Sequence, residues 1–583
     1  MKVIKQKIAE MILSGIQKIA PDASSETLPT AGDIASMLEY PPNPEMGDLA
    51  FPCFRLSKVL RRSPVQIASE IAGGLSASPV GRVDVIGGYL NIYIDNTYLS
   101  GTVLPEILEK RESYGAPDIG KGKMVVLDYS SPNIAKPFHI GHLGTTMIGH
   151  ALKKIHEFAG YRCYGINYLG DWGTQFGKLI VAYNKWGDRK VIEEGGIDEL
   201  VRLYVRINRE IDGDKENGIP GNPALADEAR AEFHKLEMGD ENNIALWKWF
   251  KEISLAEYEK TYSLLGVTFD SYLGESFYTD KMPAEVQKLR DKNLLKIDDG
   301  ASIVDLSEYG MMPCLILKRD GSTLYPTRDI AAAVYRKNEY KFDKCIYVTS
   351  SQQCLHFQQW FKVVELMGYE WADQLVHIPY GTVSIGGAKL ATRTGNVVLL
   401  RDLFDTAIEK VKSIMQEKNP NLDDMQETAE AVGVGAIVFY YLSGSRIKDI
   451  NFTMEDALNF DGNTGPYVQY TYARTCSVLN RASDVKTDGL DLTVTAEEES
   501  ALLKTLARFE EKVLAALNEY EPSIITRYIL DVATAFNRFY HNCQILNVED
   551  PTVKATRIRL TEASNIVLGS AFSLICLKKT EKV

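Results

Sequence analysis

The sequence lacks the features that mark membrane-spanning, secreted and strongly basic proteins. Its longest apolar run, residues 432–442, is far shorter than the ~20 residues that cross a bilayer. The net charge of −13 argues against coating of nucleic acid through bulk charge, but it leaves local basic patches open. The eight cysteines include no Cys-x-x-Cys pair, so we expect neither a zinc knuckle nor a disulfide framework. A reducing, cytoplasmic compartment and no membrane association fit best.

Low-complexity composition is also absent. The 44 glycines and 22 prolines are few for 583 residues, and 45% of the chain is hydrophobic. A chain of this length is expected to form about three to five domains with sizeable cores. Residues 1–20 place isoleucines at helical spacing among lysines, which predicts an amphipathic helix rather than a signal peptide.

Changes in residue pattern divide the chain into four parts. The pattern predicts a small α+β domain at residues 1–112. It predicts an α/β domain at residues 113–380, with a helical, charged insertion at about 180–320. Residues 381–455 form a connecting region, and residues 456–583 predict an all-α domain. The α+β prediction comes from two alternating, strand-like segments that flank Gly87-Gly88.

The α/β prediction comes from short, nearly continuous apolar runs, which are typical of buried parallel strands. Such runs occur at residues 124–129 and 162–169, with helical spacing between them. Two more occur at residues 345–348 and 376–379, again with a helix between. Strand, helix and strand in this order predict a doubly wound sheet.

The sharpest chemical feature is His139-Ile-Gly-His142, because the chain has only eight histidines. The motif follows a predicted strand–helix loop and opens a helix, so it should lie at the carboxyl end of the sheet, where ligands bind in open α/β folds. A helix N-terminus favours phosphate, and Gly141 would let a nucleotide lie against the backbone. Two capping histidines are the simpler alternative. A zinc site is disfavoured and we expect no bound metal centre, because no further ligands are nearby.

The stretch Asp128-Tyr-Ser-Ser-Pro-Asn-Ile-Ala-Lys-Pro-Phe-His-Ile-Gly-His-Leu143 closely resembles a motif of the arginyl-tRNA synthetases, which are class I aminoacyl-tRNA synthetases with a Rossmann-type catalytic domain. The resemblance covers nearly the whole chain. It continues in Gly170-Asp-Trp-Gly-Thr-Gln-Phe-Gly177, Tyr325-Pro-Thr-Arg-Asp329, Ser350-Ser-Gln-Gln353 and Gly462-Asn-Thr-Gly-Pro-Tyr-Val-Gln-Tyr470.

The second motif of class I enzymes, Lys-Met-Ser-Lys-Ser, is altered in this sequence. The matching stretch is Lys389-Leu-Ala-Thr-Arg-Thr-Gly-Asn396, with Thr392 where the second lysine usually stands. Many arginine enzymes depart in the same way and carry a lysine upstream of the first motif. The resemblance implies that Lys136 takes over this role.

The resemblance implies ATP-dependent ligation of L-arginine to tRNA(Arg), through an arginyl-adenylate and with transfer to the 2′-OH of the terminal adenosine. Negative charge grows on the phosphoryl oxygens during adenylate formation, so catalysis needs positioned donors and cations, with Mg²⁺ as counter-ion. The implied catalytic residues are Lys136, His139, His142 and Lys389. The same four residues are expected to bind ATP together with Gly141, Arg393, Gly395 and Asn396.

The resemblance also implies sites for arginine and tRNA. Asp329 and Tyr325, with Glu275, are expected to bind the substrate guanidinium, which matches a carboxylate through two parallel hydrogen bonds. Asn133, Gln353 and His139 are expected to hold the α-amino and carboxylate end, with Asp128 nearby. The implied tRNA contacts are Asn91 in the N-terminal domain and Gln469, Tyr470, Arg474 and Asn537 in the C-terminal domain, which reads the anticodon in this family.

The sequence leaves three rival functions open. A class I synthetase for another amino acid would need a pocket without Asp329 and Tyr325. A nucleotidyltransferase that makes a small cofactor also uses His-x-Gly-His, but it would not need the terminal domains. A catalytically dead RNA-binding relative should have lost His139, Gly141 or His142. We therefore expect an active enzyme. We also expect it to work as a monomer.

Overall fold

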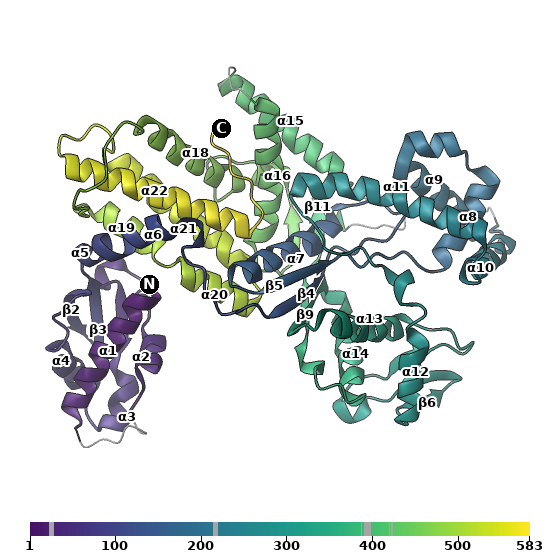
Figure 1. Ribbon diagram of the computed structural model, residues 1–583, viewed down its shortest axis with the longest axis horizontal. Helices are drawn as coiled ribbons and strands as arrows, with labels where there is room; N and C mark the ends of the chain where they lie inside the picture. Colours follow the sequence, from purple (N-terminus) through teal and green to yellow (C-terminus); the bar gives the residue numbers. More distant parts are fainter. Residues whose placement is uncertain are drawn as a thin grey trace.

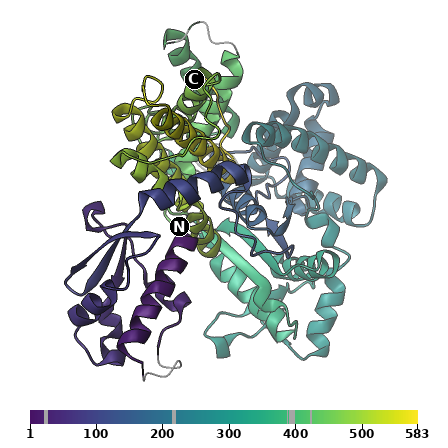
Figure 2. The same cartoon turned by 60° about the vertical axis from the view of Figure 1, so that its left-hand side comes forward.

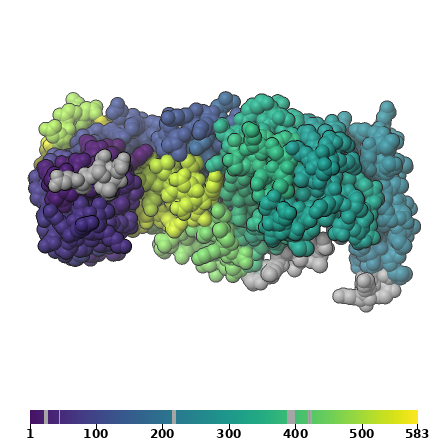
Figure 3. Space-filling model, turned by 90° about the horizontal axis from the view of Figure 1, so that it is seen from below, coloured from purple at the N-terminus to yellow at the C-terminus, as the bar shows by residue number. Residues whose placement is uncertain are grey.

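The computed structural model describes residues 1–21, 28–213, 220–385, 388–389, 398–418, 420 and 424–582. The molecule is elongated, with the N-terminal domain at one end and the helical insertion at the other (Figure 3). The central sheet lies between these ends, and the C-terminal helices lie above the N-terminal domain and extend toward the sheet (Figure 1). Within the described ranges, no helix is long and apolar enough to cross a membrane.

The central sheet has four parallel strands in the order β10-β9-β4-β5. Side chains alternate between its two faces: Val125 and Leu127 pack into one hydrophobic cluster, and Val126 packs into another. Both faces are therefore buried, which explains the continuous apolar runs. The strands are β4 (Met124–Asp128), β5 (Arg162–Ile166), β9 (Lys344–Ser350) and β10 (Leu375–Tyr380).

Helices cover both faces of this sheet, which confirms the predicted doubly wound architecture. Helix α7 (Ile140–Phe158) connects β4 to β5 on one face, and α13 (Tyr325–Tyr340) and α14 (Cys354–Leu366) lie on the other (Figure 1). The chain runs outward from β4 to β5 on one side and from β9 to β10 on the other. The carboxyl ends of the adjacent strands β4 and β9 therefore border the crevice in which such folds bind ligands.

The segment between β5 and β9 is long and contains more than helices. A helical part comes first, followed by a small antiparallel sheet that the sequence did not predict. Each strand of this sheet has only four residues, and the middle of β6 is exposed, with Ile297 open to solvent. The elements are α8 (Thr174–Trp186), α9 (Arg189–Asp212), α10 (Pro223–Glu237), α11 (Glu241–Leu265), η5 (Glu275–Tyr278), α12 (Met282–Asp291), β6 (Leu295–Asp298), β7 (Ala301–Val304), η6 (Ser307–Tyr309) and β8 (Cys314–Leu317).

The N-terminal domain packs helices on an antiparallel sheet of order β1-β3-β2. The two strands predicted around Gly87-Gly88 are present, and both glycines have positive φ (59° and 87°), as a two-residue hairpin turn requires. The elements are α1 (Lys2–Ile19), α2 (Ala31–Met37), η1 (Pro44–Met46), β1 (Leu49–Pro52), η2 (Cys53–Leu56), α3 (Ser57–Leu60), α4 (Pro64–Ala72), β2 (Val80–Ile86), β3 (Tyr89–Ile94), α5 (Asn96–Tyr98), η3 (Leu99–Val103), α6 (Leu104–Lys110) and η4 (Arg111–Ser113).

After β10 the chain forms a small three-stranded sheet and then a helical bundle. The sheet, of order β12-β11-β13, was not predicted, because its strands have two or three residues each. The elements are η7 (Ser351–Gln353) and η8 (Ala372–Gln374) on either side of α14, β11 (Val383–Ile385), β12 (Ala388–Lys389), α15 (Leu400–Lys418), α16 (Met425–Ser443), β13 (Ile450–Phe452), α17 (Met454–Ala457), α18 (Gly465–Arg481), α19 (Glu497–Leu506), α20 (Phe509–Glu519), α21 (Ser523–Asn542) and α22 (Pro551–Leu574).

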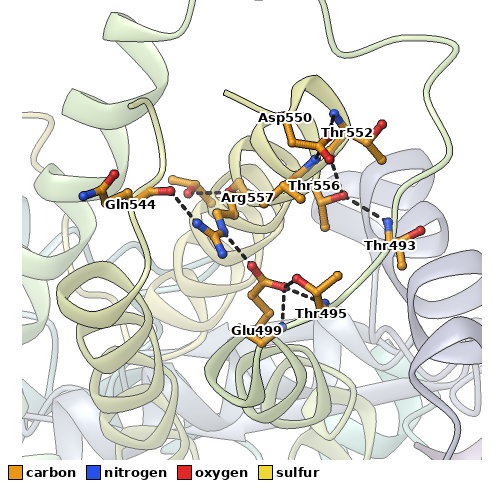
Figure 4. Close-up of polar contacts among 11 residues, drawn as sticks. Thr493, Thr495, Glu499, Gln544, Asp550, Thr552, Thr556 and Arg557 are labelled. Carbon is orange, nitrogen blue, oxygen red and sulfur yellow. Dashed lines mark hydrogen bonds and ion pairs between the residues drawn. The ribbon is translucent and has the colours of Figure 1, made fainter. Parts of the chain in front are cut away.

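A buried ion pair holds the bundle together where the polar stretch before α19 ends. Arg557 on α22 donates from Nε to Oε1 of Glu499 at 2.6 Å and from Nη1 to the carbonyl of Gln544 at 2.7 Å (Figure 4). The other carboxylate oxygen of Glu499 accepts the backbone N–H groups of Thr495 and Ala496. The Glu499–Arg557 pair thus joins the start of α19, helix α22 and the loop that follows α21.

The N-terminal domain docks on the C-terminal bundle (Figure 2). The ammonium of Lys2 lies 3.0 Å from Oε1 of Glu510, and the ammonium of Lys504 lies 2.8 Å from Oδ2 of Asp48. The hydroxyl of Ser500 donates to Oδ1 of Asn96 at 2.7 Å. Polar contacts between α19 or α20 and the first 100 residues therefore contribute to this interface.

Candidate active site

Helix α7 begins with an imidazole cap. His139 is the N-cap residue, and its Nδ1 accepts the backbone N–H of Gly141 at 3.0 Å. The backbone N–H of His139 donates in turn to Nδ1 of His142 at 3.2 Å. A Cβ on Gly141 would lie 2.7 Å from Cε1 of His139, so a larger residue would displace the ring. With both Nδ1 atoms used as acceptors, each neutral ring carries its proton on Nε2.

Both rings are held in the neutral form. Burial, and then the nearby charge of Lys136, lower the pKa of His139 to about 4. Burial and the neighbouring His139 lower the pKa of His142 well below its usual range. The ring of Phe138 stacks on His142 with 4.9 Å between centroids. At neutral pH the two residues can donate hydrogen bonds from Nε2, but they do not add positive charge.

The loop between β4 and α7 has a constrained backbone. Ser130, Ser131 and Ala135 have positive φ values of 70°, 49° and 56°, a region that residues with a Cβ rarely adopt. The insertion holds this loop: the hydroxyl of Tyr258 on α11 donates to the carbonyl of Lys136 at 2.7 Å, and the hydroxyl of Ser254, also on α11, accepts the N–H of Ala135 at 3.0 Å. Such strain persists only where surrounding structure fixes it, and it is common at functional sites.

The segment after the second-motif loop lies beside these elements. The N–H of Leu400 donates to the carbonyl of Phe138 at 3.0 Å, and Leu399 pairs with His139. The backbone of Lys389 pairs with Ser384 in the small sheet. The side chain of Lys389 and the predicted ATP ligands Arg393, Gly395 and Asn396 lie outside the described residues, as does Thr392.

Two predicted arginine ligands already face guanidinium groups of the protein. Asp128 ends β4 and lies 2.8 Å from Nη2 of Arg336, which is fully buried. Glu275 lies 2.8 Å from Nη1 of Arg328. Burial raises the pKa of Glu275 to about 7, against the opposing effect of Arg328. The pKa of Asp128 is raised by burial, although Arg336 acts in the opposite direction.

The third carboxylate, Asp329, lies close to the other two. Its negative charge contributes to the raised pKa values of both Asp128 and Glu275. Oδ2 of Asp329 lies 2.6 Å from Nε2 of His356, a residue that no sequence motif had indicated. Three acidic side chains thus gather around Asp329, and such a cluster suits a cationic substrate.

The remaining predicted arginine ligands lie at the surface. Tyr325 is the first residue of α13 and is 67% exposed. Asn133 lies in the loop after β4 and Gln353 in the turn after β9, and both residues are exposed. Asn133 packs tightly against Gly170, where a Cβ would lie 2.1 Å from Oδ1 of Asn133.

A further residue that was not predicted, Asp171, joins several parts of the site. It is fully buried, and its carboxylate accepts the N–H of Ser276 at 2.8 Å and the ammonium of Lys251 at 2.6 Å. Ser276 directly follows Glu275, so Asp171 fixes the short helix that carries Glu275. The sequence signal was present, since Asp171 belongs to the Gly170–Gly177 stretch, but its role was not apparent.

The predicted tRNA contacts divide into exposed and buried residues. The guanidinium of Arg474 lies 4.9 Å from the ring centroids of both Tyr470 and Tyr540, and Tyr470 is 46% exposed. Asn537 accepts a hydrogen bond from Arg474 and donates to the hydroxyl of Tyr467 at 3.0 Å. These side chains form a surface of aromatic, amide and guanidinium groups.

Gln469 and Asn91 are the two buried residues among the predicted tRNA contacts. Gln469 is fully buried, and its amide donates to the carbonyls of Ala431 at 3.1 Å and Lys578 at 3.0 Å. It therefore joins α16 and the C-terminal segment. Asn91, on the middle strand β3 of its sheet, is only 2% exposed. Helical spacing alone did not reveal which face of α18 is buried.

Comparisons with known proteins agree with this geometry. A family model described as the catalytic domain of class I tRNA synthetases (R) matches residues 103–454. Models described as the arginyl tRNA synthetase N terminal domain and the DALR anticodon binding domain match residues 2–94 and 468–583.

Individual relatives cover almost the entire chain. An arginine–tRNA ligase of Clostridioides difficile is 50% identical over 553 residues, which cover 94% of this chain and 96% of that protein. One from Alkaliphilus metalliredigens is 48% identical over 585 residues and covers 100% of both chains. The solved arginyl-tRNA synthetase of Thermus thermophilus superposes with a TM-score of 0.81 at 25% identity, over 100% of both chains. Since the catalytic-domain model spans more than half of the sequence and these relatives align from end to end, the chain belongs to the arginyl-tRNA synthetases of class I.

Proposed function

We propose that this chain ligates L-arginine to tRNA(Arg) in two steps. A carboxylate oxygen of arginine attacks the α-phosphorus of ATP, and pyrophosphate leaves. The 2′-OH of the terminal adenosine of tRNA then attacks the carbonyl carbon of the adenylate, and AMP leaves. The observation that carries this proposal is the neutral His139–His142 pair at the start of α7, together with the cluster of Asp128, Glu275 and Asp329.

The histidine pair suits the phosphate end of ATP. A neutral imidazole with its proton on Nε2 can donate to a phosphoryl oxygen in the ground state and more strongly as charge grows there. The N-terminus of α7 favours the same charge. Lys136, whose charge already acts on both rings, would supply a cation from the loop. Gly141 keeps the backbone accessible, and Lys389 is proposed as the cation of the second motif.

Arg393, Gly395 and Asn396 are also proposed to bind ATP. Mg²⁺ is expected to arrive with the triphosphate rather than in a protein cage. In the described part of the chain, no group of three or more His, Cys, Asp and Glu side chains is arranged to hold a metal ion.

The acidic pocket suits the guanidinium of arginine. Asp329 and Tyr325, with Glu275, are proposed to bind it, since a carboxylate matches a guanidinium through two parallel hydrogen bonds. Asn133 and Gln353 would hold the α-amino and carboxylate end, together with His139. Asp128 would act from behind the pocket, because Arg336 already occupies it.

The surface of Tyr470, Arg474 and Asn537 suits unpaired bases of the anticodon loop. Aromatic rings and a guanidinium plane provide stacking surfaces, and an amide can bond to base edges. Gln469 is proposed to support this surface from inside the bundle. Asn91 would need a local opening of its sheet to reach tRNA.

The decisive experiment offers the purified protein ATP, bulk tRNA and each of the twenty amino acids in turn. We expect arginine alone to become attached to tRNA. Incorporation of another amino acid in place of arginine would refute the assignment.

Pyrophosphate exchange with arginine should stay near background without tRNA and rise when tRNA is added, as in a site that tRNA completes. Sedimentation of the same sample tests the proposed monomer. The eight free cysteines of the described chain support the proposed cytoplasmic compartment.

A further inference from the structure

The three carboxylates of the proposed arginine pocket differ in the group that faces each of them. Asp128 faces the guanidinium of Arg336, and Glu275 faces the guanidinium of Arg328, each with 2.8 Å between nitrogen and oxygen. A guanidinium is a fixed cation that presents a fork of N–H donors, which is the same group that the substrate brings. Both carboxylates are therefore at least partly committed to cations of the protein.

Asp329 has a different partner. Its Oδ2 lies 2.6 Å from Nε2 of His356, and an imidazole presents a single N–H along one direction. An ionised carboxylate offers about four acceptor positions on its two oxygens. One N–H from an imidazole therefore leaves both oxygens with room for the two parallel donors of a guanidinium. Asp329 and His356 are 21% and 26% exposed, so the pair is accessible to a substrate.

The backbone around His356 is firmly held. His356 lies in the first turn of α14, and the next residue, Phe357, stacks on His377 of β10 with 4.2 Å between ring centroids. Trp360, one turn further, is fully buried. Asp329 lies on the neighbouring helix α13. The contact therefore connects the carboxylate of Asp329 to an imidazole on a helix that packs firmly into the core.

We propose that His356 is a positioning residue: it fixes the carboxylate of Asp329 so that both oxygens face the guanidinium of the bound arginine. His356 itself does not touch the substrate. This inference rests on the proposed assignment of Asp329 to the guanidinium. This role explains why Asp329 is held by an imidazole, whereas Asp128 and Glu275 face arginines. The carboxylate of Asp329 must stay available to the guanidinium of the substrate.

The test measures aminoacylation with arginine varied and with ATP and tRNA saturating. Loss of the negative charge in Asp329→Asn should raise the arginine KM at least about 100-fold. His356→Phe keeps a ring but removes the donor, and should raise the arginine KM roughly 10- to 100-fold while the ATP KM changes little. In the double variant, the KM should equal that of Asp329→Asn alone, because His356 acts only through Asp329.

Two amide substitutions separate positioning from general packing. His356→Gln places an amide N–H near the position of Nε2, whereas the shorter side chain in His356→Asn does not reach it. We expect His356→Gln to stay within a few-fold of the wild-type arginine KM and His356→Asn to resemble His356→Phe. His234→Phe, at an exposed position on α10, is the matched control and should leave the arginine KM unchanged. Thermal unfolding of each variant shows whether it folds.

The possible outcomes separate this inference from the assignment on which it rests. An unchanged arginine KM in Asp329→Asn would remove the assignment of Asp329 and the inference together. A large effect of Asp329→Asn with a wild-type KM in His356→Phe and His356→Asn would overturn the inference alone. The same holds if the effects of Asp329→Asn and His356→Phe multiply in the double variant, since His356 would then act independently.

Discussion

His139 and His142 are joined through the backbone, because the N–H of His139 donates to Nδ1 of His142 while its own Nδ1 accepts the N–H of Gly141. Each imidazole thus serves a structural and a chemical purpose at once. Nδ1 completes the cap of α7. Nε2 carries the N–H group that can donate a hydrogen bond to a phosphoryl oxygen.

The two purposes can be separated by His139→Asn. The amide oxygen of asparagine is a good N-cap acceptor and can replace Nδ1, but asparagine has no donor at the place of Nε2. We expect the single-turnover rate of adenylate formation to fall about 10²–10³-fold, with only a small change in the thermal unfolding temperature. A loss of stability that matches the loss of rate would mean that His139 is only a cap.

The raised pKa of Glu275 predicts a pH dependence of arginine binding. Its pKa of about 7 means that the carboxylate gains a proton as the pH falls below neutrality. A guanidinium binds the ionised form, so the arginine KM should rise as the pH falls from 8 to 6, approaching roughly tenfold per pH unit. Steady-state aminoacylation across this range measures the effect.

Glu275→Gln is the control for this pH dependence. It should bind arginine more weakly and show a flat KM between pH 6 and 8. A flat profile in the wild-type enzyme would mean that Glu275 does not bind the guanidinium. Because its pKa is raised in the folded state, Glu275 also contributes stability at acid pH, and this contribution is lost as the pH rises through about 7.

Lys136→Ala tests whether this lysine replaces the missing second-motif lysine. Removal of one preorganised cation should lower the rate of adenylate formation about 10²–10³-fold, with a much smaller loss of ATP affinity. Thr392→Lys in the same background should recover part of the rate. Lys154→Ala, at a half-exposed position near the other end of α7, is the matched control. If Lys136→Ala stays within a few-fold of the wild type while Lys389→Ala carries the whole defect, the replacement hypothesis is excluded.

Arg474→Ala tests the proposed anticodon surface. The guanidinium lies against two tyrosine rings, and loss of a stacking partner weakens base binding by about 1–3 kcal/mol. We expect the KM for tRNA to rise about tenfold or more, and the arginine KM to stay constant. Arg474→Lys keeps the positive charge but loses the planar guanidinium, so its KM for tRNA should lie between those of the wild type and Arg474→Ala. Lys110→Ala on α6 is the exposed control, and an equal effect there would contradict a specific role for Arg474.

The parts of the fold that the sequence predicted are those in which local pattern and burial agree. Val125, Val126 and Leu127 form a continuous apolar run because both faces of their strand are covered. Strands β6 to β8 and β11 to β13 gave no such signal, since they are two to four residues long and depend on pairing with distant segments. The Gly87-Gly88 turn was predictable, because its two positive φ values suit glycine.

For the candidate site, the sequence indicated residue types and motifs but not their partners. The contacts of Asp128 with Arg336 and of Asp329 with His356 join residues on different elements, and no local spacing predicts them. Burial of Gln469 likewise depends on helices that pack around it from elsewhere in the chain. These contacts are fixed by tertiary packing, which a single sequence does not reveal.

The docking of the N-terminal domain on the bundle has a consequence for synthesis of the chain. Lys2 and its partner Glu510 are 508 residues apart in the sequence. At about 5–20 residues per second, the ribosome needs roughly 25–100 seconds to travel between them. During this interval the docking face of the N-terminal domain has no partner helices to cover it. The charged contacts on that face, such as Lys2 and Asp48, are well suited to this interval, because water can solvate them until the partner helices emerge.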